Sequence, residues 1–348
     1  MSEVEPYTFV RLPEGGPKRK PPLLHHRHDE EAQSGRLICR LTAKTPLFVY
    51  DPSFAHQMGG GHERADFPVR NGVAMIPGSS LKGVVRSVAE AVESCCFTLF
   101  DSFYRGGGVT RGKTLKAILP RDYEHCTHLG RLCPACRLFG SLKGDMLFAG
   151  KVTIGDARAE AGAYELADWI VLDVLSAPKP EGRPRVYTQS DGRIVRGRKF
   201  YRHRLNGVLT RLGGRQDRQN KTVRPVAAGA SFTFEVEYTD LRAEELRLLL
   251  YALALEPGLW HKVGMGKPIG LGSAQIEIVG WTQINRQTRY RVLGGGMTES
   301  LTESALQTEL DRWLRPYRES NAPNLQDLRE AWRYEHSYEV RYQTQRPR

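Results

Sequence analysis

Apolar residues alternate with polar ones in four short stretches of the chain, and this period of two predicts β-strands. The clearest stretch is residues 232–238, where Phe, Phe, Val and Tyr alternate with Thr and Glu. Similar patterns mark residues 37–41, 152–154 and 274–278. Each of these strands is therefore expected to bury one face and expose the other.

Two further stretches have a helical period instead. Leu81, Val84, Val85 and Val88 share one face of a helix that follows the first strand. Leucines at 246, 249, 250 and 253 do the same in a second helix. The resulting order is strand, helix, strand, strand, helix, strand, which matches a split βαβ, or ferredoxin-like, core. We therefore expect an α+β fold.

Composition divides the chain into a core region and two extensions. Residues 1–35 are rich in Pro, Gly and basic side chains, and we expect them to form a flexible arm. Residues 36–284 should form the main domain, with a long loop at 44–75. Residues 285–348 should form a C-terminal helical extension, with helices around 304–317 and 324–334.

Positive charge is concentrated in one part of the main domain. The chain carries a formal net charge of +12, and residues 176–225 contain fourteen Lys or Arg against three acids. Aromatic side chains lie among them, which suits nucleic-acid phosphates with stacked bases better than a solvated charge run. The residues of this segment expected to contact RNA are Arg196, Arg198, Lys199, Tyr201 and Arg202.

A glycine-rich loop at residues 264–272 directly precedes the last predicted strand. Gly264, Gly266 and Gly270 allow close approach of a ligand to the backbone, and Lys267 adds a positive charge. The loop is not a Walker A motif, because Pro follows the lysine and a strand follows the loop. A phosphate site and a plain glycine turn are the two interpretations.

A second candidate anion site lies at the start of the first helix. Ser79 or Ser80 is a good N-cap, and the free N–H groups of a helix N-terminus attract anions. Lys82 and Arg86 are four residues apart and so share one face. The alternative is a capped surface helix with solvated cations.

Cysteines at 126, 133 and 136, the last two in a C-x-x-C knuckle, predict a structural zinc site. His128 is our preferred fourth ligand. His125 and a cysteine from the end of the first helix, Cys95 or Cys96, are the alternatives. We place this zinc-knuckle insertion at about residues 95–142.

The same sequence limits where the protein works. The first residues are acidic and lack an apolar core, so no signal peptide is expected. No apolar run is long enough for a transmembrane helix, so no membrane partner is expected. Cysteines grouped as metal ligands fit a reducing compartment, and we expect a cytoplasmic protein.

Four motifs occur in a specific order along the chain. They are IPGSSLKG at 76–83, CPACRLFG at 133–140, RGRKFY at 196–201 and GMGKPIGLG at 264–272. Together they resemble the RAMP superfamily of CRISPR proteins, and within it the backbone subunits of type III effector complexes and their close relatives. The resemblance covers about residues 36–280.

The resemblance implies an RRM-like palm, a basic thumb hairpin within residues 176–225, and copies of the chain stacked along a guide RNA. Target RNA and other CRISPR effector subunits are the further partners that it implies. In that family the helix after the Pro-Gly-Ser-Ser segment and the glycine-rich loop contact the guide backbone. The matching residues here are Ser79, Ser80, Lys82, Arg86, Gly264, Lys267 and Gly270.

Many type III backbone subunits cut target RNA with an aspartate between the first strand and that helix. Asp66 occupies this position, and Asp51 is the other acid before the glycines of the same loop. Such a carboxylate holds a metal, Mg²⁺ for example, or orients a 2′-hydroxyl. The alternative is that Asp66 is a turn residue and a separate nuclease cuts.

Two other functions remain open at this point. One is a free-standing guide-processing endoribonuclease, for which His261 or His203 would be the general base. The other is a zinc-containing RNA-binding scaffold. We expect a guide-RNA-binding backbone subunit that presents the guide for pairing with target RNA.

Overall fold

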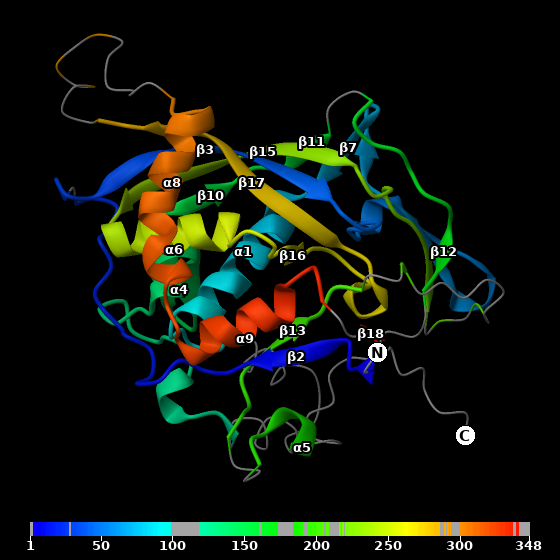
Figure 1. Cartoon of the computed structure of the whole chain (residues 1–348), viewed down its shortest axis with the longest axis horizontal. Coiled ribbons are helices and arrows are strands. Elements are labelled where there is room, and N and C mark those ends of the chain that lie inside the picture. Colours follow the sequence, from blue (N-terminus) through cyan, green and yellow to red (C-terminus); the bar gives the residue numbers. More distant parts are fainter. Residues whose placement is uncertain are drawn as a thin grey trace.

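An antiparallel β-sheet forms the centre of the computed structural model (Figure 1). Its strand order is β16-β17-β3-β15-β11-β7-β6, and β10 also pairs with β15. The strands are β3 (Gln33–Ala43), β6 (Val69–Arg70), β7 (Val73–Ile76), β10 (Val152–Ile154), β11 (Ala157–Ala159), β15 (Ser231–Leu241), β16 (His261–Lys262) and β17 (Ser273–Gln283).

The long strands bury alternate residues, as their sequence pattern predicts. On β15, Phe232, Phe234 and Val236 are buried, while Glu235 and Glu237 are exposed. β3 lies between β15 and β17 and pairs with both along almost its whole length. One face of the sheet is therefore apolar and the other carries charged side chains such as Arg40 and Glu277.

Helices cover the apolar face of this sheet. α1 (Gly78–Val92) packs against α6 (Ala243–Ala254), and α4 (Pro134–Phe139) contacts both. Leu81, Val84, Val85 and Val88, the predicted apolar face of α1, are all buried. The fold is thus a mixed α+β architecture with its core between one sheet and a helical layer.

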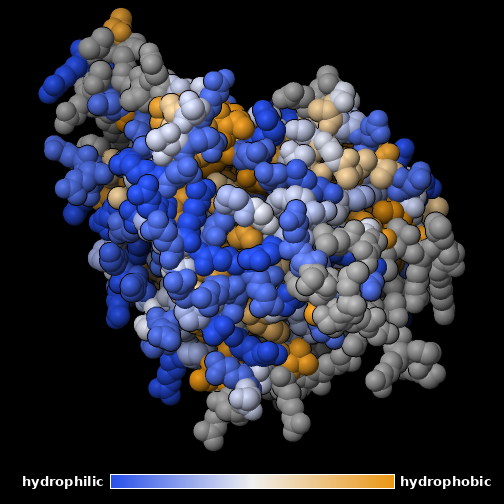
Figure 2. Space-filling model, in the orientation of Figure 1, coloured by the Kyte–Doolittle hydropathy of each residue, from blue (hydrophilic) through white to orange (hydrophobic). Residues whose placement is uncertain are grey.

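Two further helices lie in the C-terminal tail, close to the ranges predicted for them. α8 (Glu303–Arg318) packs on α6 and β17, and α9 (Pro323–Trp332) packs on α1 and β2. Figure 1 shows both helices outside the first helical layer. Figure 2 shows that the face on which they lie is mainly hydrophilic.

The segment expected as a long loop at 44–75 contains short strands, two of which enter a second sheet. That sheet has the order β12-β14-β5-β4, and β5 runs parallel to β14. Short strands of this kind carry too little alternation to be recognised in a sequence. They are β4 (Ala55–Gln57), β5 (Glu63–Asp66), β12 (Ile170–Val171) and β14 (Lys221–Arg224).

The N-terminal segment, expected as a flexible arm, also contributes strands. β2 (Tyr7–Val10) pairs with β13 (Arg198–Tyr201) of the basic segment, and the backbones of Lys20 and Leu132 form an isolated bridge. The remaining elements are β1 (Glu3–Val4) with β18 (Glu339–Val340), β8 (Gly140–Lys143) with β9 (Met146–Ala149), α5 (Pro184–Tyr187), and the 3-10 turns η1 (Pro52–Phe54), η2 (Gly59–Gly61), η4 (Arg121–Tyr123) and η5 (Lys267–Ile269).

The structure describes most of the chain. The described residues are 3–27, 29–98, 118–159, 162–172, 184–190, 194–204, 207–208, 216, 218, 220–285, 289, 291, 293, 300–336 and 339–340. Much of the expected thumb hairpin and part of the cysteine insertion lie outside these ranges. No helix within them is long and apolar enough to cross a lipid bilayer.

Candidate functional site

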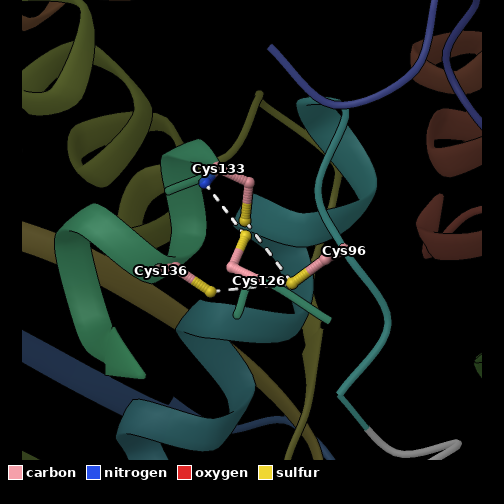
Figure 3. Close-up of side chains that lie close together, drawn as sticks. All are labelled: Cys96, Cys126, Cys133 and Cys136. Atoms are coloured by element: carbon pink, nitrogen blue, oxygen red, sulfur yellow. Dashed lines mark hydrogen bonds between the residues drawn. The ribbon is translucent and has the colours of Figure 1, made fainter. Parts of the chain in front are cut away.

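Four buried cysteines meet beside the C-terminal end of α1. The sulfur atoms of Cys96, Cys126, Cys133 and Cys136 all lie within 4.8 Å of one another. Figure 3 shows the four side chains converging, with Cys133 from the N-cap of α4, Cys136 from α4 itself, Cys126 from the stretch before it and Cys96 from the stretch after α1. Four thiol groups at this separation, shielded from water, suit tetrahedral zinc.

Local structure explains how each of these cysteines is placed. Cys96 lies four residues past the end of α1, where the chain turns back toward α4. Cys133 is the N-cap of α4, and its backbone N–H donates to the Cys126 sulfur at 3.3 Å. A hydrogen bond with the Cys126 thiol lowers the pKa of Cys133 well below its ordinary value, which favours the thiolate that a metal binds.

The predicted fourth ligand, His128, is not part of this group. Its side chain is exposed, and Cys96, one of the alternatives, occupies the fourth position. His125 is likewise engaged elsewhere, because its Nε2 lies 3.1 Å from the Ser141 hydroxyl. The spacing of residues 126–136 locates three ligands, but only the fold brings the end of α1 to them.

Cations on α1 face the interior rather than solvent. Arg86 donates from Nε to Glu90 at 2.8 Å and from Nη1 to the carbonyl of Gly140 at 3.0 Å, and its Nη2 lies 3.8 Å from the Cys136 sulfur. Lys82 donates to the carbonyl of Val152 at 3.0 Å. The two cations share a face, as predicted, but that face packs on the protein.

The start of α1 differs from the prediction. Pro77 holds the N-cap position, so neither Ser79 nor Ser80 caps the helix. The Asp156 carboxylate accepts from the first helical N–H, that of Gly78, at 2.8 Å. Capping from a neighbouring loop lets the helix begin before the serines, and one of the N–H groups expected to bind an anion is already used.

Arginines of the basic segment are also partly internal. Arg198 donates to Glu90 at 2.8 Å and to the carbonyl oxygens of Cys95 and Cys96 at 2.7 and 2.9 Å. Arg202 donates to Glu330 at 2.8 Å. These two side chains attach β13 to the cysteine centre and to α9.

The other side of β13 forms, with β2, a partly exposed strip of aromatic and basic side chains. Lys199 Nζ lies 3.8 Å from the Tyr7 ring centroid and 5.0 Å from that of Tyr201. Arg196 lies 5.3 Å from the Phe9 ring centroid, counted from Cζ. Tyr7 and Phe9, which the sequence did not single out, complete a surface suited to stacked bases.

The glycine-rich loop is pinned against the segment that leaves β3. The Met265 N–H donates to the carbonyl of Phe48 at 2.8 Å, and a Cβ at Gly264 would lie 2.0 Å from that same oxygen. Gly266 and Gly270 have φ angles of 75° and 106°, which favour glycine. The loop is therefore a rigid, closely packed turn.

Two lysines lie together at this loop. Lys267 is half-buried, and burial lowers its pKa. Lys262, missed by the sequence reading because it lies in an otherwise apolar stretch, is buried and donates to the carbonyl of Leu271 at 3.1 Å. Burial, and then the charge of Lys267, lower its pKa to about 7. Neither lysine forms an ion pair within the described residues, and Lys267, the less buried of the two, is the one that an anion at the loop can reach.

The histidines considered as nuclease bases are structural. The Nε2 of His261 donates to the carbonyl of Ala252 at 3.0 Å in the core, and burial lowers its pKa to about 4. His203 bridges the Ser273 hydroxyl and the carbonyl of Trp260. Buried rings held in this way do not face a substrate, which removes support from a histidine-dependent nuclease.

The two acids of the segment at 44–75 have different surroundings. Asp51 caps η1 by accepting from the Ser53 N–H at 2.9 Å, and it lies 3.6 Å from Arg70. Asp66 is the last residue of β5, is half-buried and stands in register with Arg224 of β14. Asp51 is thus used for turn formation, whereas the Asp66 carboxylate remains a candidate for chemistry.

A family model described as the RAMP superfamily matches residues 40–275. The matched stretch is more than half of the chain, and it includes Asp66, α1, the four cysteines and the glycine-rich loop. No curated protein matches the chain.

Proposed function

The chain belongs to the RAMP superfamily, and we propose that it is a guide-RNA-binding backbone subunit of a CRISPR interference complex. Membership indicates a CRISPR-associated RNA-binding subunit with other effector subunits as partners. In the proposal, several copies stack along the guide RNA and present it for pairing with target RNA. The observation that carries it is the pair of lysines, without acidic partners among the described residues, at the glycine-rich loop of the matched stretch.

The central sheet supports an RRM-like palm. Its four main strands have the spatial order β17-β3-β15-β10, with α1 after β3 and α6 after β15 in the chain. Numbered along the chain, this is the order 4-1-3-2 of a ferredoxin-like fold. The open face of the sheet carries both signs of charge, with Arg36 paired to Glu235 and Glu237. RNA phosphates are therefore better matched by the loops than by this face.

The guide path in this proposal runs over the glycine-rich loop and the strip formed by β2 and β13. A phosphate at the loop would favour the charged form of Lys262 and Lys267. Bases would stack on the aromatic rings of the strip beside Lys199. Arg86 and Arg198, which contact the cysteine centre, would then act by holding α1 and β13 in place.

The thumb of the proposal has its base in the second sheet. β12 and β14 pair antiparallel, with Ile170 opposite Val223. The chain therefore leaves the second sheet at residue 172 and returns to it next to the same point at residue 221. Most of the net positive charge belongs to this excursion. The resemblance implies a basic thumb hairpin, and in the proposal its base lies beside Asp66, which stands opposite Arg224 of β14.

The four cysteines would hold one structural zinc ion. Four thiolates and one Zn²⁺ carry a net charge of −2, and the guanidinium of Arg86 beside Cys136 offsets part of it. All four positions are taken by protein, so no site is left for a substrate. The ion would join α1 to α4 and, through Arg198, to β13.

We further propose that Asp66 cuts target RNA. Its carboxylate would hold Mg²⁺ or orient the attacking 2′-hydroxyl toward the adjacent phosphate. The half-buried position in β5 and the absence of an ion pair to any described residue support this role. A complex that relies on a separate nuclease is the alternative outcome of the test at Asp66.

Binding of repeat-derived guide RNA tests the main proposal. Lys267→Glu should weaken binding about tenfold at moderate salt, because it reverses a charge at the phosphate site. Arg40→Glu, the same charge change on the open sheet face, is the matched control. Anisotropy titrations that give the Lys267→Glu protein the affinity of the parent would contradict the proposed path.

A further inference from the structure

Two arginines and one tryptophan gather on the face of the second sheet that carries Asp66. Arg64 lies two residues before Asp66 on β5, so both side chains lie on the same face. Arg224 stands opposite Asp66 on β14, and Trp169 directly precedes β12, which pairs with β14. His56, opposite Arg64 on β4, is exposed at the border of this face.

The arginines stack with the indole. Cζ of Arg64 lies 3.6 Å from the Trp169 ring centroid, which is a stacking distance for a guanidinium on a ring. Cζ of Arg224 lies 5.8 Å from the same centroid. The Trp169 side chain is only partly buried, so the stack borders on solvent.

The charges of the two arginines are not paired within the part of the chain that the structure describes. Within the described residues neither arginine forms an ion pair, although a carboxylate stands directly opposite Arg224. The Nε of Arg224 is buried and has no hydrogen-bond partner there. An unpaired buried donor costs free energy, and a ligand atom that accepted from it would offset that cost.

Two unpaired guanidiniums beside a flat ring suit a ligand that is both planar and anionic. A nucleotide has these two properties, because its base stacks on indole or guanidinium planes and its phosphate accepts from arginine. We propose that Arg64, Trp169 and Arg224 form a binding platform for one unpaired RNA nucleotide next to Asp66. This inference rests on the proposed RNA-binding function and adds a residue-level site to it.

Substitution of the ring tests the stacking part of the platform. With the full chain and a single-stranded oligouridine, Trp169→Ala should lower affinity about tenfold, whereas Trp169→Phe should retain most of it. A melting curve for each variant shows whether it is folded. Equal affinity of the folded Trp169→Ala protein and the parent would overturn the proposal.

The charges give a separate readout that a structural role would not change. Arg64→Gln and Arg224→Gln should each reduce the slope of log affinity against log salt by about 0.7, the value for one phosphate contact on a single strand. Trp169→Ala should leave that slope unchanged. Arg40→Gln is the matched control on the open sheet face, and slopes in the platform variants no different from the Arg40→Gln slope would contradict the assignment.

Photocrosslinking separates this inference from the function on which it rests. RNA that carries 4-thiouridine should crosslink to the peptide with Trp169 as well as to the glycine-rich loop. Crosslinks at the loop alone would overturn the platform and leave the guide-binding proposal intact. No RNA binding by the parent protein would overturn both, whereas crosslinks at Trp169 with an inactive Asp66 would retain the platform and reject cleavage.

Discussion

Single residues show how the same side chain serves different purposes according to its surroundings. Arg86 and Arg198 are of a residue type that is common on RNA-binding surfaces. In this fold, however, both contact Glu90 and groups of the cysteine centre. The spacing of Lys82 and Arg86 indicated a shared cationic face, but no pattern along the chain tells which neighbour that face meets. Lys262 is the opposite case: the sequence pattern did not single it out, yet it lies buried beside Lys267 at the candidate phosphate loop.

The buried lysine makes stability depend on pH. The pKa of Lys262 falls from 10.5 to about 7 in the folded protein. Between these values the unfolded chain binds the extra proton, so the free energy of unfolding should rise with pH from about 7 to 10.5. Lys262→Met should remove up to about 5 kcal/mol of that rise, at about 1.4 kcal/mol per pKa unit. Urea unfolding at several pH values, with Lys44→Met as control, measures it, and an unchanged pH profile would contradict the assigned burial.

The catalytic proposal also belongs to one residue. In the assembled complex, Asp66→Ala should lower the rate of target RNA cleavage by about 10²–10⁴-fold. Guide and target affinity should change little, because a reacting carboxylate contributes more in the transition state than in the bound state. Asp51→Ala is the control, since Asp51 caps η1. Full cleavage by the Asp66→Ala complex would place the nuclease elsewhere.

At the scale of elements, alternation and helical period were enough to locate β15, α1 and α6, because their apolar faces are long. The short strands β4 and β5 gave no such signal, because β5 depends on pairing with β14, more than 150 residues away, and β4 depends on pairing with β5. The fourth cysteine of the metal site likewise depends on where α1 ends. The periodicity of apolar residues was enough to predict the long elements. The composition of the site depends on contacts between segments that are far apart in the chain, which no local pattern reveals.

Metal binding at the four cysteines should stabilise the packing of α1 against α4. Cys133→Ser should reduce the zinc content from about one ion per chain to near zero and lower the Tm by about 5–10 °C, because ligand binding energy is folding energy at such sites. Cys39→Ala changes a buried cysteine of β3 outside the cluster and should retain zinc. Elemental analysis that finds no zinc in the parent protein would reject the site.

In the whole molecule, segments that are far apart in the sequence contact one another at three places. The N-terminal strand β2 pairs with β13, the Asp66 strand β5 pairs with β14, and the glycine-rich loop packs on the exit of β3. The basic segment is therefore anchored by β2 at one point and by β5 at another. The four cysteines, Asp66 and the glycine-rich loop lie within the stretch that the RAMP model matches, whereas β2, part of the proposed guide path, precedes it.

The most direct test of this account is the length of RNA that the assembled protein protects. After purification and nuclease trimming, stacked copies should leave guide RNA fragments whose lengths rise in fixed increments, one increment per subunit. Lys267→Glu should weaken this ladder, whereas Arg40→Glu should leave it unchanged. A smear of unrelated lengths, or purified protein without guide RNA, would contradict the proposal that the chain is a backbone subunit.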